Sequence, residues 1–137
     1  MDLETDSNLT AFLHSQMPFT ALLGLSAVSA SRDEVVLTAE WREDLCTTGA
    51  VVHGGYLISV ADTAGATCAV FNLSEGATTA TIESKTNMFR AVTEGTMVAT
   101  AVPVHVGRST IVVQTDITRA DGKLAARTTQ TQAVITP

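Results

Sequence analysis

The chain has 137 residues, of which 45% are hydrophobic, which is enough for one compact domain with one core and leaves no room for a second domain. Its formal net charge is −6, which argues against long-range attraction of nucleic acid. The first ten residues are acidic, unlike a signal peptide, and no apolar run reaches the roughly 18 to 20 residues that span a bilayer. We therefore expect a cytoplasmic protein that binds neither nucleic acid nor a membrane.

The first predicted element is a short amphipathic helix at about residues 7–16. Its apolar residues recur at helical spacing after two candidate caps, Ser7 and Asn8, and Pro18 ends it. The segment 35–41, VVLTAEW, alternates enough to predict a strand.

A long apolar stretch follows, in which Asp62 is the sole formal charge between residues 45 and 74. Residues 55–71 are too numerous and too rich in Ala for a strand, so they predict a helix. Because this helix is apolar or small nearly all round, we expect it to be buried rather than to lie on a surface.

The rest of the chain reads as strands with one wet face, since it is rich in Thr and Val at period two. The predicted strands are about 78–90, 96–106, 110–119 and 124–135, separated by short breaks that contain Gly. The order of elements predicts an α+β fold whose antiparallel sheet wraps around the central buried helix, with a core over about residues 33–136.

The two cysteines, Cys46 and Cys68, stand alone without metal-ligand or disulfide spacing. We expect both to be reduced and buried, and we expect no metal site.

Asp62 has two open interpretations. An isolated carboxylate in a buried helix is costly unless it is hydrogen-bonded or faces a cavity, so it is either a structural group that bonds a neighbouring segment or a functional acid. Gly54 and Gly55 also allow two readings. They permit a tight turn into the helix, or they leave backbone N–H groups uncovered at the positive end of the helix dipole, where a carbonyl oxygen gaining charge would be stabilised.

If both features are functional, one helix cannot bring them together. Eight residues separate Gly54 from Asp62, which is about 12 Å along a helix axis. Two chains with antiparallel central helices would place Gly54 of one opposite Asp62 of the other, in two equivalent sites. We therefore expect an obligate homodimer, or a dimer of dimers.

Several motifs together resemble one family. The sequence GAVVHGG (49–55), followed by ADTA (61–64), TIESKTNMFRAVTEG (81–95) and VGRS (106–109), is similar to the hotdog-fold acyl-CoA thioesterases of the phenylacetate-pathway and 4-hydroxybenzoyl-CoA type. The resemblance covers about residues 35–135. It implies the hotdog fold and hydrolysis of an acyl-CoA thioester to a free acid and CoA, with aryl, arylacetyl or medium-chain acyl groups as the candidates.

The resemblance also implies roles for residues. Asp62 would act as general base or as nucleophile, and Gly54 or Gly55 would donate its backbone N–H to the thioester oxygen. Thr81 would position the water and His53 would orient the site or the thioester. Thr81 can equally be an ordinary strand residue, and His53 a buried, hydrogen-bonded imidazole.

Thr47 departs from the family, which often has Asn or Gln at this position to contact the nucleophile or its water. The shorter side chain keeps open a non-catalytic acyl-CoA-binding module. A hydratase or dehydratase on the same fold is a weaker alternative, since Asp62 has no His at helical spacing.

Coenzyme A is part of the expected substrate, and no separate cofactor is expected. Its phosphates make Arg90 and Arg108 candidate contacts, with Asn87 and Phe89 beside them in the motif. Both arginines can alternatively be solvent-facing charges. Candidates for lining the acyl pocket are Tyr56, Leu57, Phe71, Met88 and Phe89.

Overall fold

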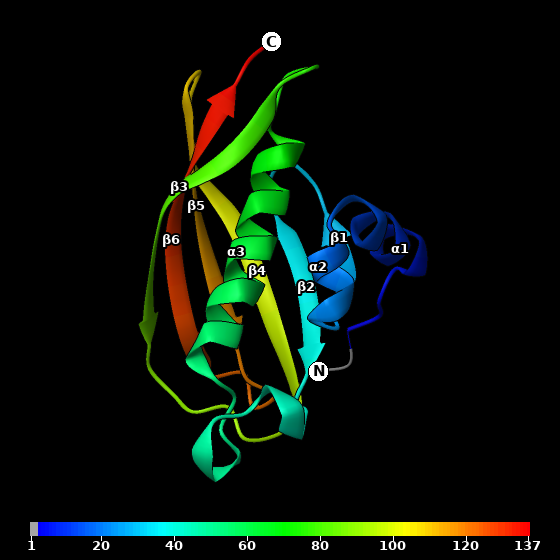
Figure 1. The fold of residues 1–137 in the computed structure, drawn as a ribbon, viewed down its shortest axis with the longest axis vertical. Helices are drawn as coiled ribbons and strands as arrows, with labels where there is room; N and C mark the ends of the chain where they lie inside the picture. The colour runs from blue at the N-terminus through cyan, green and yellow to red at the C-terminus, as the bar shows by residue number, and fades with distance from the viewer. Residues whose placement is uncertain (1–2) are drawn as a thin grey trace.

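An antiparallel sheet of six strands wraps around one long helix, α3 (Gly54–Phe71), in the computed structural model, which describes residues 3–137 (Figure 1). The strands are β1 (Ser26–Ala30), β2 (Val35–Glu40), β3 (Thr78–Met88), β4 (Thr96–Val106), β5 (Thr110–Thr118) and β6 (Leu124–Ile135). Their order in the sheet is β1-β2-β4-β5-β6-β3, and neighbours pair antiparallel. The predicted α+β fold is confirmed.

The core lies between α3 and the concave face of the sheet. Helix α3 contacts all six strands, and the strands alternate as predicted, so that every second residue of β5 is buried against the helix. The largest fully buried apolar side chains come from α3, from the strands and from the loops beside them; they are Leu25, Val35, Leu37, Val60, Val92, Met97, Ile111, Val113 and Ile117.

The N-terminal region differs from the prediction. Helix α1 covers Ser7–Gln16 as expected, but Asp6 caps it by accepting a hydrogen bond from the N–H of Leu9 at 2.9 Å. Pro18 does not only follow this helix; it is the first residue of a second one, α2 (Pro18–Leu22), where proline is favoured. Strand β1 was not predicted either, and it adds an edge to the sheet beside β2.

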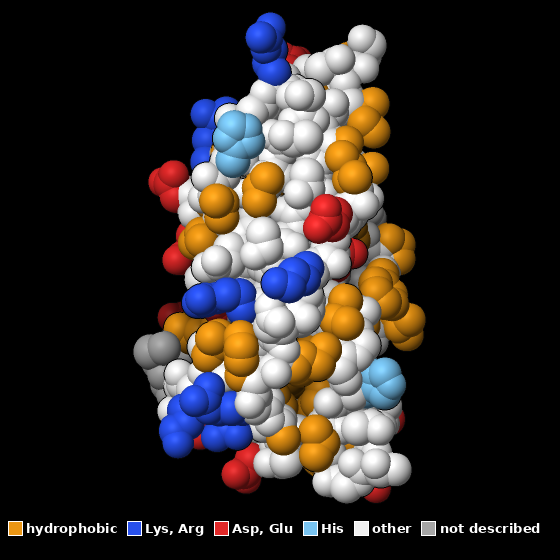
Figure 2. Space-filling view, turned by 90° about the vertical axis from the view of Figure 1, so that its left-hand side faces the viewer, with side chains coloured by type: hydrophobic (Ala, Val, Ile, Leu, Met, Phe, Trp, Pro, Cys, Tyr) orange, Lys and Arg blue, Asp and Glu red, His pale blue; other side chains and the backbone are white. Residues whose placement is uncertain are grey.

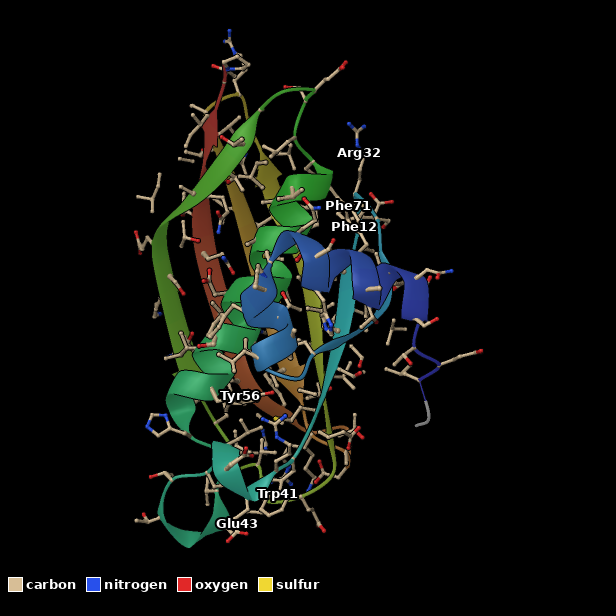
Figure 3. All side chains as sticks on the ribbon, turned by 45° about the vertical axis from the view of Figure 1, so that its right-hand side comes forward. Phe12, Arg32, Trp41, Glu43, Tyr56 and Phe71 are labelled. Atoms are coloured by element: carbon tan, nitrogen blue, oxygen red, sulfur yellow. The ribbon has the colours of Figure 1, made fainter. Side chains whose placement is uncertain are left out.

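Helix α1 packs on β1 and lies beside the C-terminal end of α3, where the side chains of Phe12 and Phe71 are close (Figure 3). Both line an apolar groove of about 240 Å³ between the two helices. Phe71 therefore belongs to this groove. At the other end of α3, Tyr56 is buried, and its hydroxyl donates to the carbonyl of Leu23 at 2.6 Å, which ties the end of α2 to the first turn of α3.

Helix α3 is not buried all round, contrary to the prediction. Ten of its residues are buried, but one stripe along its length is half-buried or exposed. The stripe consists mainly of small residues, with Asp62 near its middle: Gly54, Gly55, Ile58, Ser59, Asp62, Ala66 and Val70. The carboxylate is thus on the open side of the helix.

Strand β3 is one edge of the sheet. It pairs with β6 alone, and nine of its eleven residues are exposed, including Ile82, whose side chain is 64% exposed. Pairing shifts register between Thr81 and Glu83, which marks a β-bulge at Ile82.

Both cysteines are free thiols. Cys68 is buried as expected, whereas Cys46 is only half-buried, so that part of the prediction is wrong. Burial raises the pKa of the Cys68 thiol to about 11. None of the described helices has the length and apolarity needed to cross a membrane.

Candidate active site

The start of α3 is organised by His53. This residue is the N-cap, in an extended conformation (φ −60°, ψ 134°), and its Nδ1 accepts a hydrogen bond from the N–H of Gly55 at 2.8 Å. A neutral imidazole that accepts at Nδ1 carries its proton on Nε2. The His53 side chain is exposed rather than buried, and its Nε2–H is a free donor at the mouth of the helix.

The cap distinguishes the two glycines. Because the N–H of Gly55 is engaged by His53, it is not free for a ligand. The N–H of Gly54 makes no hydrogen bond within the described chain, and Gly54 is the first residue of the helix, where the macrodipole is positive. A Cβ on Gly54 would lie 2.9 Å from the Sδ and Cε atoms of Met88, so the glycine also lets β3 approach the helix start.

A pocket of about 380 Å³ opens beside this helix start. It brings together four of the predicted site residues, Thr47, Gly54, Phe89 and Arg90. Leu57 and Met88 supply apolar walls, as two of the candidate pocket residues were expected to do. Asp62 and Thr81 are not among its lining residues.

Asp62 lies two turns farther along α3, above the face formed by β3 and β6. Its Oδ1 accepts hydrogen bonds from the Oγ1 of Thr81, at 3.1 Å, and from the Nε2 of Gln130, at 2.9 Å. Gln132 in turn donates its Nε2–H to Thr81 Oγ1 at 2.7 Å, which directs the threonine proton toward the carboxylate. No described residue of this chain donates to Oδ2.

The bulge at Ile82 is what lets Thr81 reach Asp62. Thr81 and Thr86 are five residues apart, so on a regular strand they would point to opposite faces. Thr86 faces the interior, where its hydroxyl lies 2.7 Å from that of Thr128. The extra residue restores the parity and turns Thr81 toward the helix as well.

Gln130 and Gln132 are functional candidates that sequence reasoning missed. Both are 1% exposed and stand on the inward face of β6, although the run TTQTQ (128–132) reads as a solvent-facing strand. The glycine at position 65, within a helix, is the one local signal for Gln130, since a Cβ there would lie 1.9 Å from the Oε1 atom of that glutamine.

The predicted phosphate contacts lie at opposite ends of α3. Arg90 lines the pocket beside Gly54, and its Nη1 donates to the carbonyl of Leu124 at 2.9 Å. Arg108 lines a different pocket of about 380 Å³, next to Asn72 at the helix C-terminus. Asn87 is exposed on β3, directly opposite Arg127 of β6.

Within one chain, two groups of predicted site residues are therefore separate. The Gly54 group has a free backbone donor and an apolar pocket, the Asp62 group has a carboxylate fixed by hydrogen bonds, and about 12 Å of helix separates them. Among residues 3–137, no group of three His, Cys, Asp or Glu side chains is arranged to hold a metal ion.

Comparisons with known proteins agree on one family. The sequence model of the thioesterase superfamily matches residues 49–126, which is more than half of the chain and includes Gly54 and Asp62. Among solved structures, a thioesterase from Haemophilus influenzae superposes with a TM-score of 0.86 at 28% identity, over 98% of this chain and 94% of that one. A conserved protein of Pseudomonas aeruginosa superposes with a TM-score of 0.78 at 30% identity, over 85% of this chain and 93% of its own.

A Vibrio cholerae protein named as an esterase is 37% identical over 84 residues, which cover 61% of this chain. The aligned part is 56% of the length of that relative, and 62% for a similarly named protein of Haemophilus influenzae. The chain thus spans less than two thirds of these relatives.

Proposed function

This chain belongs to the thioesterase superfamily, and from that premise we propose that it hydrolyses acyl-CoA thioesters, with Asp62 as the reacting carboxylate and the Gly54 N–H of a partner subunit as the oxyanion donor. The observation that carries the proposal is the pair of unsatisfied groups on the open side of α3. One is a backbone N–H at the positive end of the helix, and the other is the Oδ2 oxygen of a carboxylate that is fixed through Oδ1.

These two groups match the charges of thioester hydrolysis. As a nucleophile adds to the thioester carbon, the carbonyl oxygen becomes negative, and an N–H at a helix N-terminus stabilises it. As a general base, Asp62 takes a proton from water while the water oxygen attacks the carbon. The C–S bond then breaks, and Asp62 returns the proton to the sulfur, so that CoA leaves as the free thiol.

Direct attack is the second route open to the same residue. Oδ2 would form a mixed anhydride with the acyl group as the CoA thiolate leaves, and water would then hydrolyse the anhydride. In either route Thr81 holds the carboxylate, since its hydroxyl donates its hydrogen bond to Asp62 Oδ1 rather than to the attacking water. His53, with its Nε2–H free, orients the thioester at the mouth of the pocket.

A homodimer completes the site. Two features of the surface support it. The open stripe of α3 is built mostly of small residues, which allow a second helix to approach closely, and Ile58, midway between Gly54 and Asp62, is an exposed apolar side chain 41% accessible. The β3 edge beside it has unpaired backbone groups along eleven residues and would join a second copy of itself antiparallel around the same two-fold axis.

The face over β3 and β6 carries apolar patches between a few charges of both signs (Figure 2). A single-sign field would repel an identical face, so this mixture is compatible with self-association.

The dimer also bears on the phosphates of CoA. Antiparallel helices bring the C-terminal end of the partner's α3, with its Arg108, toward the N-terminal end that holds Arg90. We propose that these two arginines, one from each subunit, contact the same CoA, with Asn87 and Phe89 beside it on β3. Each guanidinium would pair with a phosphate through parallel N–H donors.

The test is release of free thiol from a panel of aryl-, arylacetyl- and medium-chain acyl-CoA thioesters. We expect turnover by the parental chain and a loss of at least ~10²-fold in kcat for Asp62→Asn. The amide keeps an oxygen facing Thr81 and Gln130, so the fold is preserved while the base is removed. Glu75→Gln, an exposed acid just after α3, is the matched control. Parental turnover by Asp62→Asn contradicts the assignment.

Thr47 favours one alternative, a module that binds acyl-CoA without efficient turnover. Its exposed, short side chain lines the pocket but reaches less far than Asn or Gln would. Calorimetric binding of acyl-CoA without thiol release would establish that alternative. If Thr47 only limits the rate, Thr47→Gln should raise kcat, whereas a binding module would gain nothing from it.

A further inference from the structure

We propose that Gln130 is a positioning residue for the reaction, which fixes one oxygen of Asp62 so that the other is presented to the substrate, and that Gly65 is glycine to make room for it. This inference rests on the proposed thioesterase function. Gln130 is 1% exposed, and its Nε2 lies 2.9 Å from Asp62 Oδ1 and 3.4 Å from the Asp62 carbonyl oxygen. Gln130 therefore hydrogen-bonds both the side chain and the backbone of Asp62.

Gly65 accounts for how the amide fits against the helix. A Cβ at position 65 would lie 1.9 Å from Oε1 and 2.5 Å from Cδ of Gln130, far inside van der Waals contact. Glycine is a poor residue for a helix interior, and Gly65 is fully enclosed in α3. Its presence is explained by the amide group that occupies the space of the missing side chain.

Placing the amide of Gln130 against Gly65 leaves one of its hydrogen-bond acceptors unpaired. The Oε1 atom of Gln130 is buried without a hydrogen-bond partner among the described residues, which is unfavourable for folding. An apolar side chain would avoid that cost at this position. The one compensating contact of the amide is its donation to Asp62, which identifies that contact as the reason for a glutamine.

A second arm holds the same oxygen. Gln132 donates its Nε2–H to Thr81 at 2.7 Å, and Thr81 donates to Asp62 Oδ1 at 3.1 Å. The hydroxyl of Thr79 lies 3.1 Å from the other end of this amide, Gln132 Oε1, and 2.8 Å from the carbonyl oxygen of Ala133, between which its one proton is shared. The two arms, from β6 and from β3, converge on Oδ1 from different directions. The carboxylate plane is thereby fixed, and Oδ2 is the oxygen left for chemistry.

Loss of Gln130 should affect the chemical step more than binding. With Thr81 as its only anchor, the carboxylate can rotate about its Cβ–Cγ bond and exchange its two oxygens. The pocket beside Gly54 does not include Gln130, so substrate contacts there are unchanged. We expect Gln130→Met to lower kcat about 10-fold, as for loss of a hydrogen bond to a charged group, with KM within about two-fold.

The experiment uses the full chain and five variants: Gln130→Met, Gln130→Ala, Gly65→Ala, Gly65→Ala with Gln130→Ala, and Gln114→Met. Gln114 is the matched control, a half-buried strand glutamine on β5 without a hydrogen bond to Asp62. Gly65→Ala should lower kcat by displacing the amide. Once Gln130 is Ala, adding Gly65→Ala should cost nothing further, because nothing remains to be displaced. Gln114→Met should keep parental kcat.

Parental kcat in Gln130→Met, or equal losses from Gly65→Ala with and without Gln130, would overturn the inference. Failure of the proposed function is a separate outcome, namely no thiol release by the parental chain. In that case, the hydrogen bond between Gln130 and Asp62 is measured from unfolding equilibria. Gln130→Met should raise the unfolding constant about 10-fold more in the parental chain than in Asp62→Ala, and additive effects would reject the contact.

Discussion

Subunit complementation tests the shared site most directly, and Gly54→Pro is the variant that makes it clean. Gly54 is the first residue of α3, where proline is well accommodated, and His53 before it already has the extended conformation that precedes proline. The substitution removes the free N–H and also adds a Cβ that meets the flexible end of Met88. Gly54→Ala retains that N–H and places a Cβ against the flexible end of Met88, so it controls for the steric effect.

The expected magnitude follows from counting sites. Alone, Gly54→Pro should lose ~10²–10³-fold in kcat, as for removal of an oxyanion donor, and Asp62→Asn at least ~10²-fold. Equal mixing with free exchange makes about half of the dimers mixed, and each mixed dimer has one intact site and one that is doubly impaired. About one quarter of all sites are then intact, so the mixture should recover about one quarter of parental activity.

The assay is thiol release before and after subunit exchange, with the mixed dimer followed by native mass spectrometry. A mixture of Gly54→Ala with Asp62→Asn is the reference, because Gly54→Ala keeps the backbone N–H at position 54 that Gly54→Pro removes. If mixed dimers form and activity remains the mean of the two inactive parents, Gly54 and Asp62 do not act across the interface. The shared-site arrangement would then be wrong.

Three further predictions concern single groups. Tyr56→Phe removes a buried hydrogen bond and leaves a backbone carbonyl unpaired, so it should lower the free energy of unfolding by about 1–2 kcal/mol in urea titrations; an unchanged value would mean that water replaces the hydroxyl. The pKa of Cys68, raised by burial to about 11, should keep that thiol unreactive at pH 8, so that a thiol reagent modifies Cys46 alone in the native protein. The hydrogen bond from Arg119 lowers the pKa of Asp121 to about 2, so the pairing stabilises the turn above the ordinary carboxyl pKa and is lost as pH falls through about 2; a carboxyl NMR titration with an ordinary midpoint would contradict this.

The strongest predictions from sequence were those in which local pattern and burial agree. The predicted helix at 55–71 begins one residue after α3 does, because its length and Ala content exclude a strand. The strands predicted at 96–106 and 124–135 coincide with β4 and β6, because period-two alternation reflects one face packed in the core. Strand β1, with the sequence SAVSA, has small residues on both faces and so gives almost no period-two contrast. Its place in the sheet depends on pairing with β2, which a local pattern does not contain.

For a similar reason, the sequence predicted some residues of the candidate site and missed others. His53, Gly54 and Asp62 stand out because each is unusual for its local setting, and the structure shows the cap and the open carboxylate that these residues form. Gln130 looks ordinary in a strand of alternating Thr and Gln. Its burial under α3 follows from long-range packing, and its contact with Asp62 spans 68 positions of sequence.

The bare edge of β3 has a consequence for handling the protein. This eleven-residue edge strand, whose outward-facing N–H and C=O groups are unpaired and which exposes an isoleucine, forms a template on which an extended peptide can add a strand. If the chain dimerises as proposed, a folded but unpaired subunit is therefore the species most exposed to aggregation. Dilution would enlarge that population, and Ile82→Lys should improve recovery of unpaired subunits while weakening dimerisation.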